Sequence, residues 1–352
     1  MKSLTTYVSW LLIGMSALAS SSARADWLHH YVIMGDGFYR GITKLKNGQL
    51  KDEEQSSRIR AAARKQARSD RENSYLIYWH VGGESSILEL YRHGKRVYYR
   101  YFGALMDTNV TLSPVSRTDF AYMHELTHKH GLVGENTQRS LYFYGKHVAD
   151  PGANTQYFRR LYRKDYSRTD LKMGVDTLAG GRPWDLLIVN SCFMNELAFL
   201  SELASSAKLI VTAEDAVLNS PGVLPISTSN EEAPIEIARR FQTDNAAIDP
   251  RLLRFLVIDS EEITRLKAQL GDEVFRFSAD ELEDSEGLNT GEIPGQIPNV
   301  GTGEELASLK SAITRLHEDG EVPAENLRQI RELLQTNPDL GKLRLLLSEP
   351  RP

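Results

Sequence analysis

Residues 184–196 constrain the fold more than any other part of the sequence. They contain an apolar run at 186–189, which is typical of a strand buried on both faces of a sheet. Asn190 and Ser191 end this run, Cys192 follows, and leucines then recur at helical spacing. We therefore predict a buried strand, then a thiol, then a helix whose N-terminus favours the thiolate form of the cysteine.

Strand-like and helix-like stretches alternate over the predicted domain at 26–272, which indicates an α/β fold. We expect a mostly parallel six-stranded sheet with helices on both faces. Its strands are predicted at 28–34, 75–81, 141–144, 186–189, 209–212 and 253–258. Helices are predicted at 51–70, 116–130 and 261–270, a β-hairpin at 87–102, and a surface loop or short helix at 158–173.

The first 25 residues have the pattern of a secretory signal peptide. Lys2 gives a positive start, residues 10–19 are mostly apolar, and Ala23-Arg24-Ala25 offers small residues for cleavage. The apolar stretch is too short to span a membrane, so we expect a secreted or periplasmic protein with no membrane span after cleavage. The net charge of −5 over 352 residues gives no support for nucleic-acid binding, and we expect a monomer.

The C-terminal part of the sequence differs in composition from the domain before it. Residues 273–302 are acidic and rich in glycine and proline, which is typical of a linker. Two short amphipathic helices are predicted at 304–316 and 324–334. The sequence thus predicts a small helical extension at 303–352.

Cys192 is the only cysteine of the chain, so it has no partner for an internal disulfide. A leftover thiol in a secreted protein forms an intermolecular disulfide, is a reactive free thiol, or is buried and inert. The third predicted strand is followed by His147, as the fourth is followed by Cys192. Because adjacent parallel strands end side by side, we expect the imidazole and the thiol to meet there, as a cysteine nucleophile requires of its base.

The segment around Cys192 resembles the nucleophile segment of the clostripain-like cysteine peptidases, a family of the caspase-like clan. Matching positions are Asp185-Leu186, Cys192, Met194, Glu202-Leu203, Val211-Thr212-Ala213-Glu214, Leu256-Val257-Ile258-Asp259 and His147. The resemblance implies a caspase-like three-layer sandwich that hydrolyses peptide bonds. It implies that Cys192 attacks the carbonyl, that His147 protonates the leaving amine, and that the backbone N–H groups of Cys192 and Val148 form the oxyanion hole.

The chain departs from this family at two positions. Val148 replaces a glycine after the histidine, and Asn190 replaces an aspartate that helps to bind a basic P1 side chain. Cleavage after Arg or Lys would then use Asn190 together with the charge of Glu214 or Asp215. Some relatives use calcium, so the resemblance leaves calcium binding possible, although the sequence has no recognisable calcium-binding loop. We expect no other cofactor.

Two alternatives remain at the level of the sequence. His124-Glu125-Leu126-Thr127-His128 is a His-Glu-x-x-His pattern, in which two histidines bind Zn²⁺ and the glutamate is the general base of a metallopeptidase. The third ligand of the extended pattern would fall on Gly134, which has no side chain. The other alternative is a catalytically inactive caspase-like protein that binds a partner.

Overall fold

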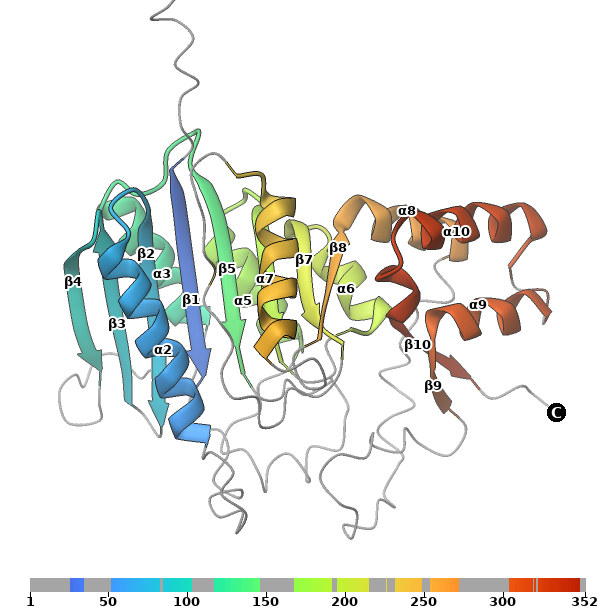
Figure 1. Cartoon of the computed structure of the whole chain (residues 1–352), viewed down its shortest axis with the longest axis horizontal. Coiled ribbons are helices and arrows are strands. Elements are labelled where there is room, and N and C mark those ends of the chain that lie inside the picture. Colours follow the sequence, from blue (N-terminus) through green and yellow to red (C-terminus); the bar gives the residue numbers. More distant parts are fainter. Residues whose placement is uncertain are drawn as a thin grey trace, which may run out of the picture.

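The computed structural model of the chain describes residues 26–34, 52–82, 85–102, 117–145, 168–191, 195–214, 226, 232–248, 254–271, 304–318, 320 and 322–348. The predicted signal peptide at 1–25 and the predicted linker at 273–302 lie outside these residues. Figure 1 shows one large sheet with helices on both faces and a smaller C-terminal part beside its β8 edge.

The large sheet has eight strands in the order β4-β3-β2-β1-β5-β6-β7-β8. The strands are β1 (Trp27–Met34), β2 (Ser74–Gly82), β3 (Ser85–Arg92), β4 (Lys95–Phe102), β5 (Gln138–Tyr144), β6 (Trp184–Asn190), β7 (Ala207–Ala213) and β8 (Phe255–Asp259). Strands β2, β1, β5, β6 and β7 run parallel to one another, whereas β3, β4 and β8 pair antiparallel. The chain moves outward in one direction from β1 to β2 and in the other from β5 to β7, so the strand order reverses between β1 and β5.

The prediction of six strands is wrong, because the sheet has eight. The predicted hairpin at 87–102 does form, as β3 and β4, but it pairs with the free edge of β2 and so extends the sheet. The last strand, β8, runs antiparallel to β7. An apolar run buried on both faces specifies a strand but not its direction, so the sequence pattern could not show this.

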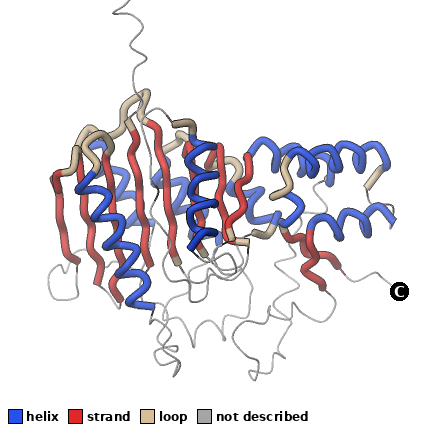
Figure 2. The backbone as a smooth tube through the Cα atoms, viewed as in Figure 1, coloured by secondary structure: helices blue, strands red, loops and turns tan. Residues whose placement is uncertain are grey.

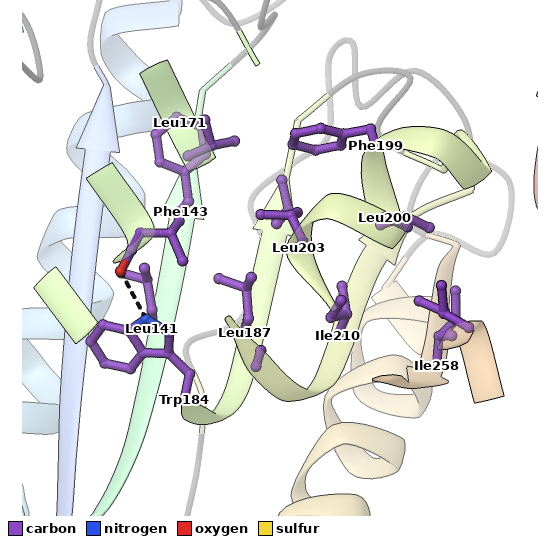
Figure 3. Packing of buried hydrophobic residues seen from close by; sticks show 14 of the residues in the cluster. Leu141, Phe143, Leu171, Trp184, Leu187, Phe199, Leu200, Leu203, Ile210 and Ile258 are labelled. Carbon is purple, nitrogen blue, oxygen red and sulfur yellow. Dashed lines mark hydrogen bonds between the residues drawn. The ribbon is translucent and has the colours of Figure 1, made fainter. Parts of the chain in front are cut away.

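Alternate residues of each central strand enter two separate cores, one on each face. One core packs the sheet against α2 (Asp52–Ser69) and α7 (Pro234–Ile248), which lie in front in Figure 1. The other packs it against α3 (Arg117–Lys129), α5 (Arg168–Ala179), α6 (Leu197–Leu203) and α8 (Ser260–Leu270). Figure 3 shows this second core, where Trp184 Nε1 donates to the Val175 carbonyl at 3.2 Å.

Two helices were not predicted as such. Helix α5 overlaps the segment expected to be a loop or short helix at 158–173, and α7 had no predicted counterpart. In α5, Leu171, Val175 and Leu178 are fully buried at helical spacing among charged residues. A few apolar positions on one face were enough to anchor each helix on the sheet, although polar residues dominate the sequence between them.

Gly174 lets α5 pack closely on α3. A Cβ atom at this position would lie 2.1 Å from Cε2 of Phe120, whose ring is buried. We expect Gly174→Ala to destabilise the protein by about 1–3 kcal/mol through overpacking, although alanine favours a helix by roughly 1 kcal/mol. Urea unfolding measures this change. Gly341→Ala is the control, because no atom lies within 4 Å of its added Cβ; equal midpoints for the two variants would contradict the prediction.

The C-terminal part contains more than the predicted helices. Residues Glu304–Ser308 form a strand, β9, rather than the start of a helix, and β9 pairs antiparallel with β10 (Arg344–Ser348). Between them lie α9 (Leu309–Glu318), α10 (Ala324–Thr336) and the 3-10 turn η3 (Leu340–Lys342). Figure 2 shows this small mixed unit beside the β8 edge of the large sheet.

Candidate functional site

Strands β5 and β6 end side by side at the carboxyl edge of the sheet. Tyr144 pairs with Asn190, and the Gly145 N–H donates to the Asn190 carbonyl at 3.2 Å. The chain then leaves the described residues toward His147 on one side and Cys192 on the other. Since β5 also borders the reversal of strand order, this edge is where an open α/β sheet places its ligands.

Several predicted site residues fall outside the described part of the chain. These are His147, Val148, Cys192 and Asp215. The structure therefore brings together the strand ends from which the two proposed catalytic side chains depart, and their roles remain predictions. Asn190 and Glu214 are described, as are the three residues of the zinc alternative.

Asn190 is completely buried at the end of β6. Its Nδ2 donates to the Tyr142 hydroxyl at 2.7 Å. Burial raises the pKa of Tyr142 above its ordinary value, and the hydrogen bond from Asn190 offsets this only in part. The amide therefore meets a neutral phenol oxygen as its acceptor, and its predicted part in substrate binding stays a prediction.

Two buried hydroxyl groups next to Asn190 were not anticipated from the sequence. Among the described residues, Ser191 Oγ and Thr212 Oγ1 have no hydrogen-bond partner, and neither has Asn190 Oδ1. Thr212 pairs in register with Val189, so all three lie at the ends of β6 and β7. A buried polar atom without a partner is uncommon, so these three atoms set the edge at the ends of β6 and β7 apart from the apolar interior of the sheet. The sequence signal for these hydroxyl groups is a polar residue at the end of each apolar run, Ser191 after 186–189 and Thr212 after 209–211.

The chain re-enters the described residues at Asn195, which is buried and donates from Nδ2 to the Glu214 carbonyl at 2.8 Å. Helix α6 begins at Leu197, and the Glu196 side chain accepts from the Ala198 N–H at 3.3 Å as its N-cap. The predicted helix exists, but it starts five residues after Cys192. A carboxylate thus already occupies the N-terminus of α6, where the sequence predicted that the thiolate would be favoured.

Glu214 follows β7 at the same edge, next to two cations. Its carboxylate lies 3.3 Å from Arg254 Nη1 and 3.8 Å from Lys342 Nζ. These residues line a depression of about 430 Å³, together with Asn195, Ser308, Gly341 and Arg344. Glu214 is thus close to the nucleophile segment, but its charge already has partners, so a basic P1 side chain would have to compete with them.

The zinc alternative places two histidines on one face of α3. The rings of His124 and His128 lie 4.5 Å apart between centroids, and His124 Nδ1 is 3.2 Å from the Leu178 carbonyl. Within the described ranges, no group of three or more His, Cys, Asp or Glu side chains could hold a metal ion. The geometry gives the zinc alternative no support there.

No helix within the described ranges combines the length and the apolar character needed to cross a bilayer.

Solved structures of proteases share this fold. An inactive zymogen of a C11 protease from Parabacteroides distasonis aligns with a TM-score of 0.56 and 13% sequence identity, covering 94% of this chain and 85% of that chain. A secreted C11 cysteine protease from Bacteroides thetaiotaomicron aligns with a TM-score of 0.48 and 10% identity, covering 71% of this chain and 70% of that chain. No protein-family model matches the chain, and no curated protein matches it by sequence.

The likeness to the zymogen shows the fold alone, because the sequence identity is only 13%. It confirms the predicted α/β fold, a sheet covered by helices on both faces. The C11, or clostripain-like, proteases are also the family whose fold the resemblance around Cys192 implied.

Proposed function

We propose that the protein is a cysteine endopeptidase that acts through Cys192 and His147. One observation carries this proposal: β5 and β6 are parallel neighbours that end in register at Tyr144 and Asn190. His147 and Cys192 follow these ends within a few residues, at the edge where the strand order reverses. The resemblance of the Cys192 segment and the shared fold support the same function independently of each other.

The proposed mechanism is nucleophilic acyl transfer. The thiolate of Cys192 attacks the peptide carbonyl carbon, and the resulting oxyanion accepts hydrogen bonds from the backbone N–H groups of Cys192 and Val148. His147 gives its proton to the leaving amine as the C–N bond breaks. Water, deprotonated by the same imidazole, then hydrolyses the thioester and releases the acid product.

The proposed substrate is a peptide or protein cleaved after a basic residue. Asn190 would contribute hydrogen bonds, while Glu214 or Asp215 would supply negative charge. Since the Glu214 carboxylate contacts Arg254 and Lys342, a basic substrate side chain would have to displace these partners to pair with it. We further propose that residues 1–25 direct the protein out of the cytoplasm, so that it acts as a secreted or periplasmic enzyme.

Thiol alkylation tests the proposed function directly. We expect iodoacetamide to label Cys192 and to abolish hydrolysis of a broad peptide library, because the chain has no other thiol. A chelator should leave the activity unchanged. Loss of activity to the chelator, with indifference to iodoacetamide, would support the zinc peptidase instead. An unreactive thiol without any turnover would support the inactive binding protein.

A further inference from the structure

The C-terminal unit at 304–348 is joined to the large domain by a common core. Leu309, Ile330 and Leu343 are buried in the same apolar cluster as Ile258 of β8 and Leu266 of α8. Asn326 Nδ2 also donates to the Gln269 carbonyl at 2.8 Å. The unit is therefore packed firmly onto the domain at its β8 edge.

Asp339 fixes the turn that leads into β10. Its buried carboxylate accepts from the Val257 N–H at 3.1 Å, from Arg239 Nη1 at 2.6 Å and from Gln242 Nε2 at 3.1 Å. One side chain of the C-terminal unit thus binds both β8 and α7. The residues that follow it, η3 and β10, start from a fixed position on the domain.

From that position, β10 contacts the segment that follows Cys192. The Arg344 N–H donates to the Asn195 carbonyl at 3.0 Å, and Arg344 forms a parallel β-bridge with Glu196. Lys342 lies 3.8 Å from Glu214, whose carbonyl accepts from the Asn195 side chain. Asn195 is therefore held between the end of β7 and the start of β10.

These contacts place anchors on both sides of the nucleophile. Only three residues, Cys192–Met194, separate Ser191 from Asn195. Strand β6 fixes the first side through its ladder with β5 and β7. The backbone of β10 fixes the second side. Because so few residues join the two anchors, we expect a displacement of either anchor to displace the sulfur as well.

We propose that the C-terminal unit is a positioning element for Cys192, acting through the Arg344 N–H bond to the Asn195 carbonyl. This inference rests on the proposed function and goes beyond it, because it assigns the extension a role in the reaction. In this role Arg344 is a positioning residue and not a catalytic one. It holds the segment that carries the reacting atoms, and misplacement by about 1 Å is enough to cost roughly a hundredfold in rate.

Arg344→Pro tests this role in the full-length protein. Proline removes the N–H that donates to Asn195, and the preceding Leu343 already has φ −59° and ψ 159°, which a following proline accepts. Arg344→Ala is the matched control, since it removes the side chain and keeps the N–H. We expect Arg344→Pro to lower kcat about 10- to 100-fold with little change in KM, and Arg344→Ala to stay close to the unmodified protein.

Two further measurements separate this inference from the proposed function. We expect faster amide hydrogen exchange at 195–200 in Arg344→Pro than in Arg344→Ala, whether or not the protein is a peptidase. We also expect the pH midpoint of Cys192 alkylation to rise in Arg344→Pro toward about 8.5, the ordinary thiol value, as the sulfur moves away from His147. Equal exchange and equal midpoints in the two variants would overturn the inference.

A second variant covers the case in which Arg344→Pro does not fold. Asp339→Asn keeps every backbone N–H but weakens the bonds to Arg239 and Val257 that hold β10 in place. We expect Asp339→Asn to speed amide hydrogen exchange at 195–200 and to lower kcat, both by less than Arg344→Pro does. No change in either quantity would overturn the inference. An unmodified protein without peptidase activity, in which Arg344→Pro still speeds exchange at 195–200 relative to Arg344→Ala, would overturn only the proposed function.

Discussion

A His147→Ala variant is expected to lose about a hundredfold to ten-thousandfold in kcat/KM on a peptide substrate. The leaving amine of a peptide is a poor leaving group unless an acid protonates it, and His147 is the proposed acid. The same change should raise the pH midpoint of Cys192 alkylation, because the thiolate loses the neighbouring imidazolium. Peptide hydrolysis and alkylation by iodoacetamide, each followed across pH, measure the two effects.

His128→Ala is the matched control for this prediction. It removes an exposed histidine from α3, which the zinc alternative needs and the cysteine mechanism does not. We expect it to retain activity. A protein that tolerates His147→Ala but loses activity with His128→Ala would show that the parallel ends of β5 and β6 are not the active site.

The central strands could be predicted from sequence because they are buried on both faces. Strands β5, β6 and β7 each contain a short apolar run, at 141–144, 186–189 and 209–211, and such runs have few structural alternatives. The antiparallel direction of β8 could not be predicted in this way. The residues of a strand specify its burial, but they do not specify the edge of the sheet at which the strand begins.

The candidate site was predictable to the extent that it lies at strand ends. The neighbouring placement of the ends of β5 and β6 follows from the alternation of strands and helices, and the structure bears it out. The contact of Arg344 with Asn195 was not predictable. The two residues are far apart in sequence, and the contact exists only because Glu304–Ser308, expected to be helical, forms a strand that pairs with β10.

The residue at which the helix after Cys192 begins could also not be predicted from the sequence. The leucine spacing predicted α6, but Glu196 determines where it starts by accepting the Ala198 N–H. A glutamate is an uncommon N-cap, because serine, threonine, aspartate and asparagine are the preferred residues. Helix α6 starts at Leu197, five residues after Cys192, so the proposed mechanism relies on His147 rather than on the helix dipole to favour the thiolate.

The protein is expected to lose stability as the pH falls below about 6.5, because β1 buries two histidines in succession. Burial lowers the pKa of His29 to about 3, although Asp70 partly opposes this. Burial, Arg139 and His29 lower the pKa of His30 to about 3. His29 Nδ1 lies 2.7 Å from Ser140 Oγ, and the His30 ring meets Trp184 edge-on at 4.9 Å.

The sign of this effect follows from proton binding. Between pH 6.5 and 3 the unfolded chain protonates both histidines, whereas the folded protein keeps them neutral. The stabilisation is thus fully present above the unfolded pKa of about 6.5 and is lost progressively as the pH falls toward the folded value. At pH 5 the loss is about 2 kcal/mol for each histidine, since one pKa unit corresponds to about 1.36 kcal/mol.

Urea unfolding of a His30→Leu variant at pH 7 and pH 5 measures one half of this loss. Leucine keeps the contact with Trp184 apolar and removes one titrating group, so the decrease in stability between the two pH values should shrink by about 2 kcal/mol. Val32→Ala, a buried change in the same strand without a titratable group, should lower the stability equally at both pH values. A His30→Leu variant that loses as much stability as the unmodified protein would show that His30 is already protonated in the folded state at pH 5.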